Sequence, residues 1–191
     1  MTGAREDDPR LGEIVVGADE IRRRVVELGA EITRDYADRT PLLVGILKGA
    51  FVFMADLARS IDRPVEVDFM AVSSYGSSTR TSGVVRILKD LDVDLGGRDV
   101  ILIEDIADSG LTLRYLRRSL MARQPASVEI CCLLVREGVP DLQDLVRYQG
   151  FPVPPGWVVG YGLDVGERYR HLDDIVAYKT DEDAGSGSVA G

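Results

Sequence analysis

The stretch that most constrains the fold of this chain covers residues 99–113, Asp-Val-Ile-Leu-Ile-Glu-Asp-Ile-Ala-Asp-Ser-Gly-Leu-Thr-Leu. It begins with a largely β-branched apolar run, Val100–Ile103, which is typical of a strand buried on both faces of a parallel sheet. A turn of small residues, Ala107–Gly110, follows, and a helix-like segment starts at Leu111. The stretch therefore predicts a strand, a tight turn and a helix within an α/β sheet.

The same stretch places polar groups where such sheets bind ligands. Glu104 and Asp105 follow the apolar run, at the carboxyl end of the expected strand. The amino end of the next helix offers unpaired N–H groups that suit a phosphate, and Gly110 permits close approach. Carboxylates that accept several hydrogen bonds suit a sugar diol. The pattern indicates a ribose-phosphate site, whereas the alternative is a rim of solvated acids with Asp108 as a helix cap.

Length and charge narrow the class of protein. A chain of 191 residues is most simply one domain and can bury a core of its own. A formal net charge of −9 argues against nucleic acid as a partner, because phosphate backbones require a basic face. It does not exclude a small phosphorylated substrate, since a bound divalent cation can dominate the local field.

Cysteine usage and hydropathy indicate a cytoplasmic protein without a membrane anchor. Cys131 and Cys132 are adjacent in an apolar run, so on a strand they face opposite sides and are not expected to form a disulfide with each other. They are expected to be core residues of a reducing compartment, and the spacing of a zinc site is absent. The start of the chain lacks the apolar core of a signal peptide, and no apolar run approaches the ~18 residues of a membrane span.

The remaining periodicity predicts alternating strands and helices. Strands are expected at 13–17, 42–47, 65–72, 84–88 and 128–135, and helices at 19–37, 51–60 and 112–123. This alternation predicts an α/β fold with a mostly parallel central sheet flanked by helices on both faces. Residues 1–12 are expected to be flexible, 13–179 to form the domain and 180–191 to form a disordered tail. A small hood is expected from about 1–17 together with 140–180.

Three further segments allow two interpretations each from the residues alone. Lys48-Gly49 at a strand end is either an anion site or a surface lysine beside a turn. The polar segment 73–83 is either a loose hairpin tip or a lid that closes over substrate. Trp157 is either a core or rim residue or a ring that stacks on a flat base. His171, the only histidine, is expected at the surface.

The segment Glu-Asp-Ile-Ala-Asp-Ser-Gly-Leu-Thr-Leu at 104–113 resembles the phosphoribosyl-diphosphate motif of type I phosphoribosyltransferases, in the version of the hypoxanthine-guanine phosphoribosyltransferases. Further motifs match in the same order, so the resemblance covers about residues 13–179. They are Leu47-Lys48-Gly49, where the bond before the lysine can be cis in the family, Ser74-Tyr75-Gly76 of the family's mobile loop, Trp157–Asp164 and Glu167-Arg168-Tyr169-Arg170.

The resemblance implies transfer of a 5-phosphoribosyl group from phosphoribosyl diphosphate to N9 of hypoxanthine or guanine, with Mg²⁺ and release of pyrophosphate. It also implies a homodimer or homotetramer. Two alternatives remain open. One is the same chemistry on xanthine or a pyrimidine, and the other is a protein that senses phosphoribosyl diphosphate or nucleotides with weak catalysis.

The resemblance also implies a role for each motif residue. Glu104 and Asp105 would hold the ribose hydroxyls, and Asp108 would be the general base near purine N7. The 5′-phosphate cradle would consist of Asp108, Ser109, Gly110, Leu111 and Thr112. The pyrophosphate site would consist of Lys48, Gly49 and Arg170, and the purine site of Arg136, Trp157, Val158 and Asp164. The metal site would consist of Glu104, Asp105 and Asp164. Ser74 and Tyr75 would belong to the lid.

Two positions depart from the family pattern. Arg136 stands where the family carries a lysine that donates to the exocyclic oxygen of the purine. Arginine can also donate there, but it is longer and forked. The alternative is a solvated surface arginine. Val165 replaces a common tyrosine, and no consequence follows from the sequence.

Overall fold

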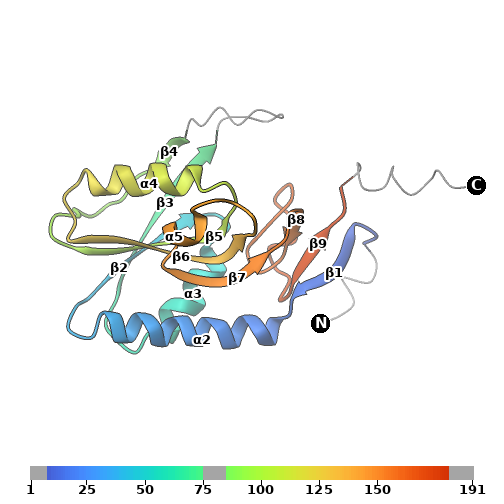
Figure 1. The fold of residues 1–191 in the computed structure, drawn as a ribbon, viewed down its shortest axis with the longest axis horizontal. Coiled ribbons are helices and arrows are strands. Elements are labelled where there is room, and N and C mark those ends of the chain that lie inside the picture. Colours follow the sequence, from blue (N-terminus) through green and yellow to red (C-terminus); the bar gives the residue numbers. More distant parts are fainter. Residues whose placement is uncertain (1–7, 75–84, 181–191) are drawn as a thin grey trace, which may run out of the picture.

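The computed structural model describes residues 8–74 and 85–180. Its main feature is a six-stranded sheet in the order β4-β3-β2-β5-β6-β7 (Figure 1). All neighbouring strands are parallel except β4, which pairs antiparallel to β3 at one edge. The predicted α/β fold with a mostly parallel sheet is therefore confirmed. The strands are β2 (Leu42–Leu47), β3 (Glu66–Ser74), β4 (Val85–Lys89), β5 (Asp99–Ala107), β6 (Ser127–Arg136) and β7 (Tyr148–Val153).

Helices cover both faces of this sheet (Figure 1). Helices α2 (Ala18–Asp35) and α3 (Phe51–Ser60) pack on one face, and α4 (Leu111–Met121) packs on the other. A short helix, α5 (Leu142–Leu145), precedes β7. The predicted apolar stripe of the first helix is buried, because Ile21, Val25, Leu28 and Ile32 are each at most 2% exposed.

The two cysteines show how the strands divide the core. Cys131 lies in the apolar cluster under α2 and α3, whereas Cys132 lies in the cluster under α4. Both thiols are free and fully buried, and burial raises their pKa values above the ordinary range. Adjacent residues of β6 therefore face opposite layers, as a strand buried on both sides requires.

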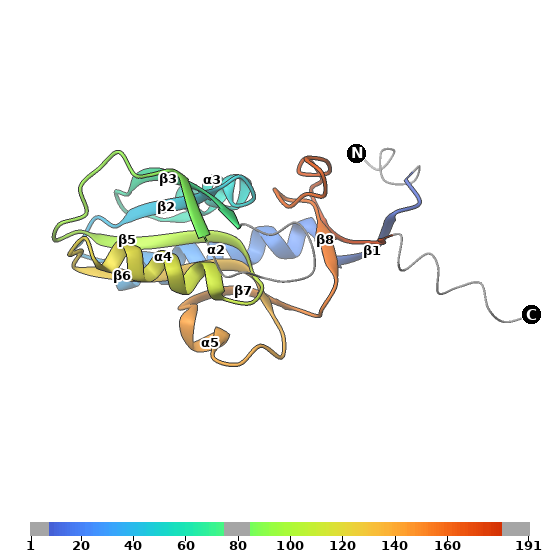
Figure 2. The ribbon, with the colours of Figure 1, turned by 90° about the horizontal axis from the view of Figure 1, so that it is seen from above.

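A second, three-stranded antiparallel sheet lies at one end of the molecule (Figure 2). It consists of β1 (Leu11–Val16), β9 (Ile175–Tyr178) and β8 (Trp157–Val159), in that order. The hood was predicted to consist of residues 1–17 and 140–180. The first part of the second segment does not belong to it. Both α5 and β7 belong to the main domain, because β7 pairs with β6 and Leu142 is buried under α4.

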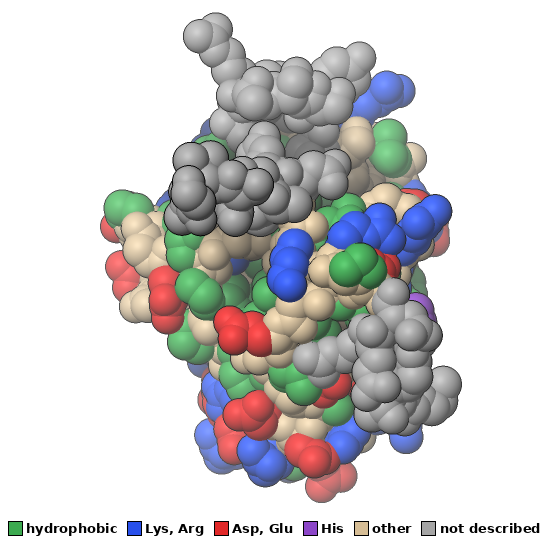
Figure 3. Space-filling model, turned by 90° about the vertical axis from the view of Figure 1, so that its right-hand side faces the viewer, with side chains coloured by type: hydrophobic (Ala, Val, Ile, Leu, Met, Phe, Trp, Pro, Cys, Tyr) green, Lys and Arg blue, Asp and Glu red, His purple; other side chains and the backbone are tan. Residues whose placement is uncertain are grey.

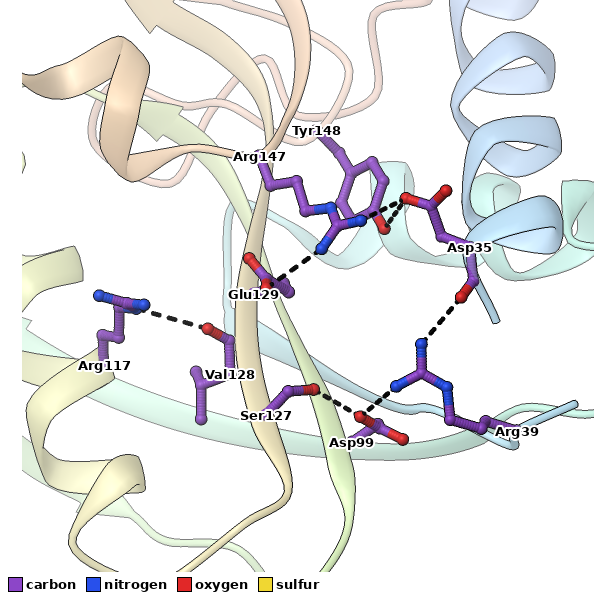
Figure 4. A network of polar contacts seen from close by, with 9 residues as sticks. All are labelled: Asp35, Arg39, Asp99, Arg117, Ser127, Val128, Glu129, Arg147 and Tyr148. Carbon is purple, nitrogen blue, oxygen red and sulfur yellow. Dashed lines mark hydrogen bonds and ion pairs between the residues drawn. The ribbon is translucent and has the colours of Figure 1, made fainter. Parts of the chain in front are cut away.

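A polar network ties together the edge of the sheet at which the strands begin (Figure 4). Asp35 at the end of α2 accepts hydrogen bonds from Arg147 (2.7 Å) and from the hydroxyl of Tyr148 (2.8 Å). Arg147 also binds Glu129 of β6, and Asp99 of β5 pairs with Arg39. These contacts fix one end of α2 to three strands and leave the opposite strand ends free for a ligand site.

Several predictions fall on residues outside the described part. Residues 1–7 of the segment 1–12 that was predicted to be flexible, the predicted tail after residue 180 and Tyr75 with the rest of the lid up to residue 83 belong to this group, whereas Leu11 and Gly12 begin β1. Ser74 ends β3. Within the described residues, no helix is both long enough and apolar enough to span a bilayer.

Candidate active site

A cavity of about 550 Å³ opens where the carboxyl ends of β5 and β6 face the small sheet. Its lining combines residues from three separate predicted motifs, namely Asp105, Asp108, Arg136, Trp157, Val158 and Asp164. The cavity therefore joins the acidic end of β5, the end of β6 and the segment at β8. Figure 3 shows this end of the molecule, where basic and acidic side chains lie among hydrophobic ones.

Glu104 and Asp105 differ from the prediction in one respect. β5 continues to Ala107, so both acids lie inside the strand, and Glu104 is in register with Cys132 of β6. Burial, and then the neighbouring charge of Asp105, raises the pKa of Glu104 well above its ordinary value. Burial also raises the pKa of Asp105, although its carboxylate accepts a 2.8 Å hydrogen bond from the Ile106 N–H. Two adjacent, partly buried carboxyls resist full ionisation until a cation or donor groups approach.

The turn after β5 forms the open amino end of α4. Gly110, with φ of 72°, is the cap residue, and no side chain caps this helix. The Ser109 hydroxyl accepts a 3.4 Å hydrogen bond from the Leu111 N–H, and Thr112 lies in the first helical turn. Most N–H groups of the first turn thus remain available to an anion.

Asp108 is not the helix cap, because Gly110 is the cap residue of α4. Its side chain is 70% exposed, and Oδ1 accepts a 2.8 Å hydrogen bond from Arg136 Nε. Arg136 is not a solvated surface residue either, because its side chain is only 12% exposed and Nη1 donates to the Pro154 carbonyl. The arginine therefore bridges the turn after β5 to the segment that precedes Trp157.

Trp157 and Val158 begin β8 at the mouth of the cavity. The indole of Trp157 is 63% exposed, an unusual exposure for so large an apolar ring. Val158 is half-buried and pairs with Ala177 of β9. The exposed ring thus offers a flat apolar surface on the cavity wall.

Lys48 and Gly49 follow β2 in a tight loop, and the Leu47–Lys48 peptide bond is cis. A Cβ atom at Gly49 would overlap the carboxylate of Asp105. Gly162 (φ of 102°) packs equally closely, since a Cβ atom there would overlap the Gly49 carbonyl. These two glycines bring the lysine loop, the acidic end of β5 and the 160–170 loop into direct contact.

The 160–170 loop carries a chain of ion pairs. Arg170 Nη2 lies 2.9 Å from Asp164 Oδ1 and 3.1 Å from Glu167 Oε2, and Nη1 donates to the Gly162 carbonyl. Glu167 Oε1 pairs with Lys48 Nζ at 3.0 Å. Both expected pyrophosphate-binding cations thus meet on one carboxylate.

The described residues contain no ready-made metal cluster of three or more His, Cys, Asp or Glu side chains. The donors that a hard cation prefers are nevertheless present near the cavity. Glu104 Oε2 is buried and has no hydrogen-bond partner among the described residues, and Asp105 and Asp164 both line the cavity. Mg²⁺ usually binds through one or two carboxylates together with substrate phosphates, so this donor set fits it.

Three residues that shape the site have no role predicted from the sequence. Glu167 pairs with both cations, Gly162 sets the contact of two loops, and Pro154 accepts the Arg136 bond. Only Glu167 had a local signal, because an acid three residues before Arg170 can reach it. The contacts of Gly162 and Pro154 depend on segments distant in sequence.

The profile of the phosphoribosyl transferase domain matches residues 17–165, which are more than half of the chain. Fold and site thus define a phosphoribosyltransferase. Within that class, the chain belongs to the hypoxanthine-guanine phosphoribosyltransferase family, as its relatives show.

Among these relatives is the hypoxanthine-guanine phosphoribosyltransferase of Mycobacterium bovis, which is 49% identical over 171 residues, covering 86% of this chain and 85% of that protein. The enzyme of Bacillus subtilis is also 49% identical, over 88% of this chain and 94% of its own length.

Solved structures agree. The hypoxanthine phosphoribosyltransferase of Staphylococcus aureus superposes with a TM-score of 0.84 at 40% identity, over 89% of this chain and 92% of that one. The hypoxanthine phosphoribosyltransferase of Trypanosoma cruzi gives a TM-score of 0.85 at 35% identity, over 94% and 97%.

Proposed function

We propose that this enzyme transfers the 5-phosphoribosyl group of phosphoribosyl diphosphate to N9 of hypoxanthine or guanine, giving IMP or GMP and pyrophosphate in purine salvage. The observation that carries the proposal is the single cavity shared by Asp105, Asp108, Arg136 and Trp157. The names of the relatives, at about half identity over most of the chain, support the same substrates.

The phosphoribosyl group is held along the end of β5. Glu104 and Asp105 accept hydrogen bonds from the two ribose hydroxyls, which would satisfy the unpartnered Glu104 Oε2. The 5′-phosphate lies against the turn and first helical residues 108–112, where N–H groups and the Ser109 and Thr112 hydroxyls donate. This arrangement orients the C1′ atom toward the base.

The base lies between Trp157 and the end of β6. Trp157 stacks on the purine, and the Val158 backbone meets the edge of the ring. Arg136 donates to the 6-oxo oxygen, whereas the 6-amino group of adenine would place a donor against a donor. The site thus favours 6-oxopurines.

Transfer of the phosphoribosyl group to the base requires an acceptor for a proton of the base. The bond from N9 to C1′ forms as the C1′–oxygen bond to pyrophosphate breaks, and the base gives up a proton. Asp108 accepts it near N7, because its exposed carboxylate faces the cavity beside Arg136. An oxocarbenium-like transition state leaves most of the remaining catalysis to positioning and charge stabilisation.

The leaving pyrophosphate is held by Lys48, the Gly49 backbone and Arg170. Mg²⁺, when bound with the substrate, would neutralise the charge that develops on the leaving group. Glu104, Asp105 and Asp164 are the residues that would hold it, directly or through water. Tyr75 and Ser74 stay assigned to the lid.

We also propose a cytoplasmic homodimer or homotetramer without a nucleic-acid or membrane partner. Buried free thiols and an acidic composition support the location and the absence of nucleic acid. Assembly is supported by the Trypanosoma cruzi neighbour, for which the C-terminal region has been studied for its role in oligomeric state and activity.

One observation favours a sensor as the second candidate function. The expected base Asp108 is paired with Arg136, and a permanent pair would hold it away from the purine. Turnover of phosphoribosyl diphosphate with hypoxanthine, followed by ultraviolet absorbance, separates the two. IMP formation is expected, whereas ligand binding without IMP or GMP formation would replace the enzyme with the sensor.

A further inference from the structure

The Glu167 carboxylate occupies both cations that the proposed function gives to pyrophosphate. Oε1 lies 3.0 Å from Lys48 Nζ, and Oε2 lies 3.1 Å from Arg170 Nη2. Each oxygen thus accepts from a different cation, as two phosphate oxygens of a bound pyrophosphate would. Lys48 and Glu167 are both exposed, so the carboxylate can leave without unpacking a core.

The loop geometry directs this carboxylate toward the cations. Glu167 has a φ of 65°, and its backbone N–H donates a 2.8 Å hydrogen bond to Asp164 Oδ2. Gly166 and Tyr169 also have positive φ values, so several residues adopt backbone conformations that L side chains rarely adopt. Glu167 therefore presents its two carboxylate oxygens to Lys48 and Arg170 where an incoming anion would otherwise bind them.

From this geometry, we propose that Glu167 is an internal anion that stands in for pyrophosphate and must be displaced when the diphosphate group binds. The proposal rests on the proposed pyrophosphate site of Lys48, Gly49 and Arg170. The exposed ion pair of Glu167 with Lys48 adds little to folding stability, so its main effect is on ligand affinity. Glu167 weakens the binding of phosphoribosyl diphosphate and, by returning to the cations, speeds release of the product pyrophosphate.

Calorimetric titration with inorganic pyrophosphate and magnesium chloride tests the proposal on the full chain. We expect Glu167→Gln to bind pyrophosphate roughly threefold to tenfold more tightly than the wild type, because the ion pairs of Glu167 with Lys48 and Arg170 no longer compete with the ligand. The gain should shrink as salt rises, since screening weakens exposed pairs. In turnover, the variant should show a lower KM for phosphoribosyl diphosphate without a rise in kcat.

Two variants control for simpler explanations. Glu13→Gln removes the same charge from an exposed carboxylate of β1 and should leave pyrophosphate affinity unchanged. Glu167→Asp keeps the charge but withdraws it by one carbon, so it should also bind more tightly than the wild type. If Glu167→Asp binds pyrophosphate as the wild type does, the effect of Glu167 comes from its negative charge alone and not from its direct contacts with the two cations. That result would contradict the proposed displacement of Glu167 by pyrophosphate.

The outcomes also separate this inference from the proposed function. If the wild type binds pyrophosphate and Glu167→Gln binds it equally or more weakly, the competing role of Glu167 is wrong. If the wild type binds neither pyrophosphate nor phosphoribosyl diphosphate, the proposed pyrophosphate site itself fails.

Discussion

At the scale of single residues, the site depends on the pair formed by Asp108 and Arg136. The guanidinium of Arg136 donates to Asp108 on one side and to the Pro154 carbonyl on the other, so one residue connects the turn after β5 to the segment that precedes Trp157. Under the proposed function, a purine with a 6-oxo group would take over one of these donors as it binds, and the Asp108–Arg136 pair would then open.

Removing the charge of Asp108 tests its role as proton acceptor. Asp108→Asn should lower kcat by ~10²-fold or more, the usual scale for a positioned acid or base. Steady-state kinetics with saturating hypoxanthine measures this, and Asp144→Asn on the surface of α5 serves as the matched control. Wild-type turnover in Asp108→Asn would remove Asp108 from the mechanism.

Restoring the family's lysine tests whether Arg136 suits this chain. We expect Arg136→Lys to lower kcat/KM for hypoxanthine by about threefold to tenfold, because an ammonium cannot reproduce the planar fork. The measurement is kcat/KM for hypoxanthine in both proteins. A much higher kcat/KM in Arg136→Lys than in the wild type would instead mean that Arg136 lowers the catalytic rate of the natural chain.

At the scale of elements, the site is the meeting of three loops at one edge of the sheet. The turn after β5, the lysine loop after β2 and the 160–170 loop each come from a different part of the chain. Gly49 and Gly162 allow these loops to touch, since neither position has space for a Cβ atom. Substitutions there act on the relative placement of the loops, without removing a chemical group.

Gly162→Ala should separate the lysine loop from the 160–170 loop. We expect a tenfold or larger rise in KM for phosphoribosyl diphosphate, because Lys48 and Arg170 would no longer converge on one ligand. Gly166→Ala is the matched control, as Gly166 also has a positive φ but open space around it. It should cost roughly 1–2 kcal/mol of backbone strain and leave KM near that of the wild type. Equal KM values for the two variants would contradict the close-contact explanation.

Local elements could be predicted from the sequence more completely than distant contacts. The strand–turn–helix at 99–113 was predictable because periodicity and turn residues act over a few positions, and it forms as β5, Gly110 and α4. The assignment of β7 to the hood was wrong, since a parallel partner is chosen by packing across the sheet. The bridge made by Glu167 was not predicted, because Lys48 lies 119 residues away.

At the scale of the whole molecule, stability and chemistry occupy opposite edges of the sheet. The network of Asp35, Arg147 and Tyr148 holds the strand starts to α2, and the cavity lies at the strand ends (Figure 4). The charged loops around the cavity and the network of Asp35 thus consist of different residues at opposite edges of the sheet. Variants of that frame should change stability and leave substrate specificity unchanged.

Asp35 makes this separation testable through pH. Partial burial raises the pKa of Asp35, but the Tyr148 hydrogen bond and the Arg147 pair outweigh it and leave the pKa below 3.8. A lowered folded-state pKa means that the stabilisation is complete above the unfolded value and is lost as pH falls through the folded value. Asp35→Asn should therefore unfold about 2–4 °C lower than the wild type near pH 7, for a loss of about 1 kcal/mol.

The difference in Tm should stay constant down to about pH 5 and shrink below about pH 4. Thermal unfolding of both proteins across this range measures it, with kcat/KM for hypoxanthine at neutral pH as the control for the site. A difference in Tm that grows in acid would contradict the assigned direction of the pKa shift.

The measurement that tests the central claim most directly is the ratio of kcat/KM for hypoxanthine to that for adenine, with phosphoribosyl diphosphate and magnesium. A base site in which Arg136 donates to a 6-oxo group predicts a ratio of at least ~10³, because a 6-amino group leaves buried donors unpaired. Guanine should behave as hypoxanthine does, while turnover of xanthine or uracil alone would indicate a different base. A ratio near one, or a preference for adenine, would contradict the account.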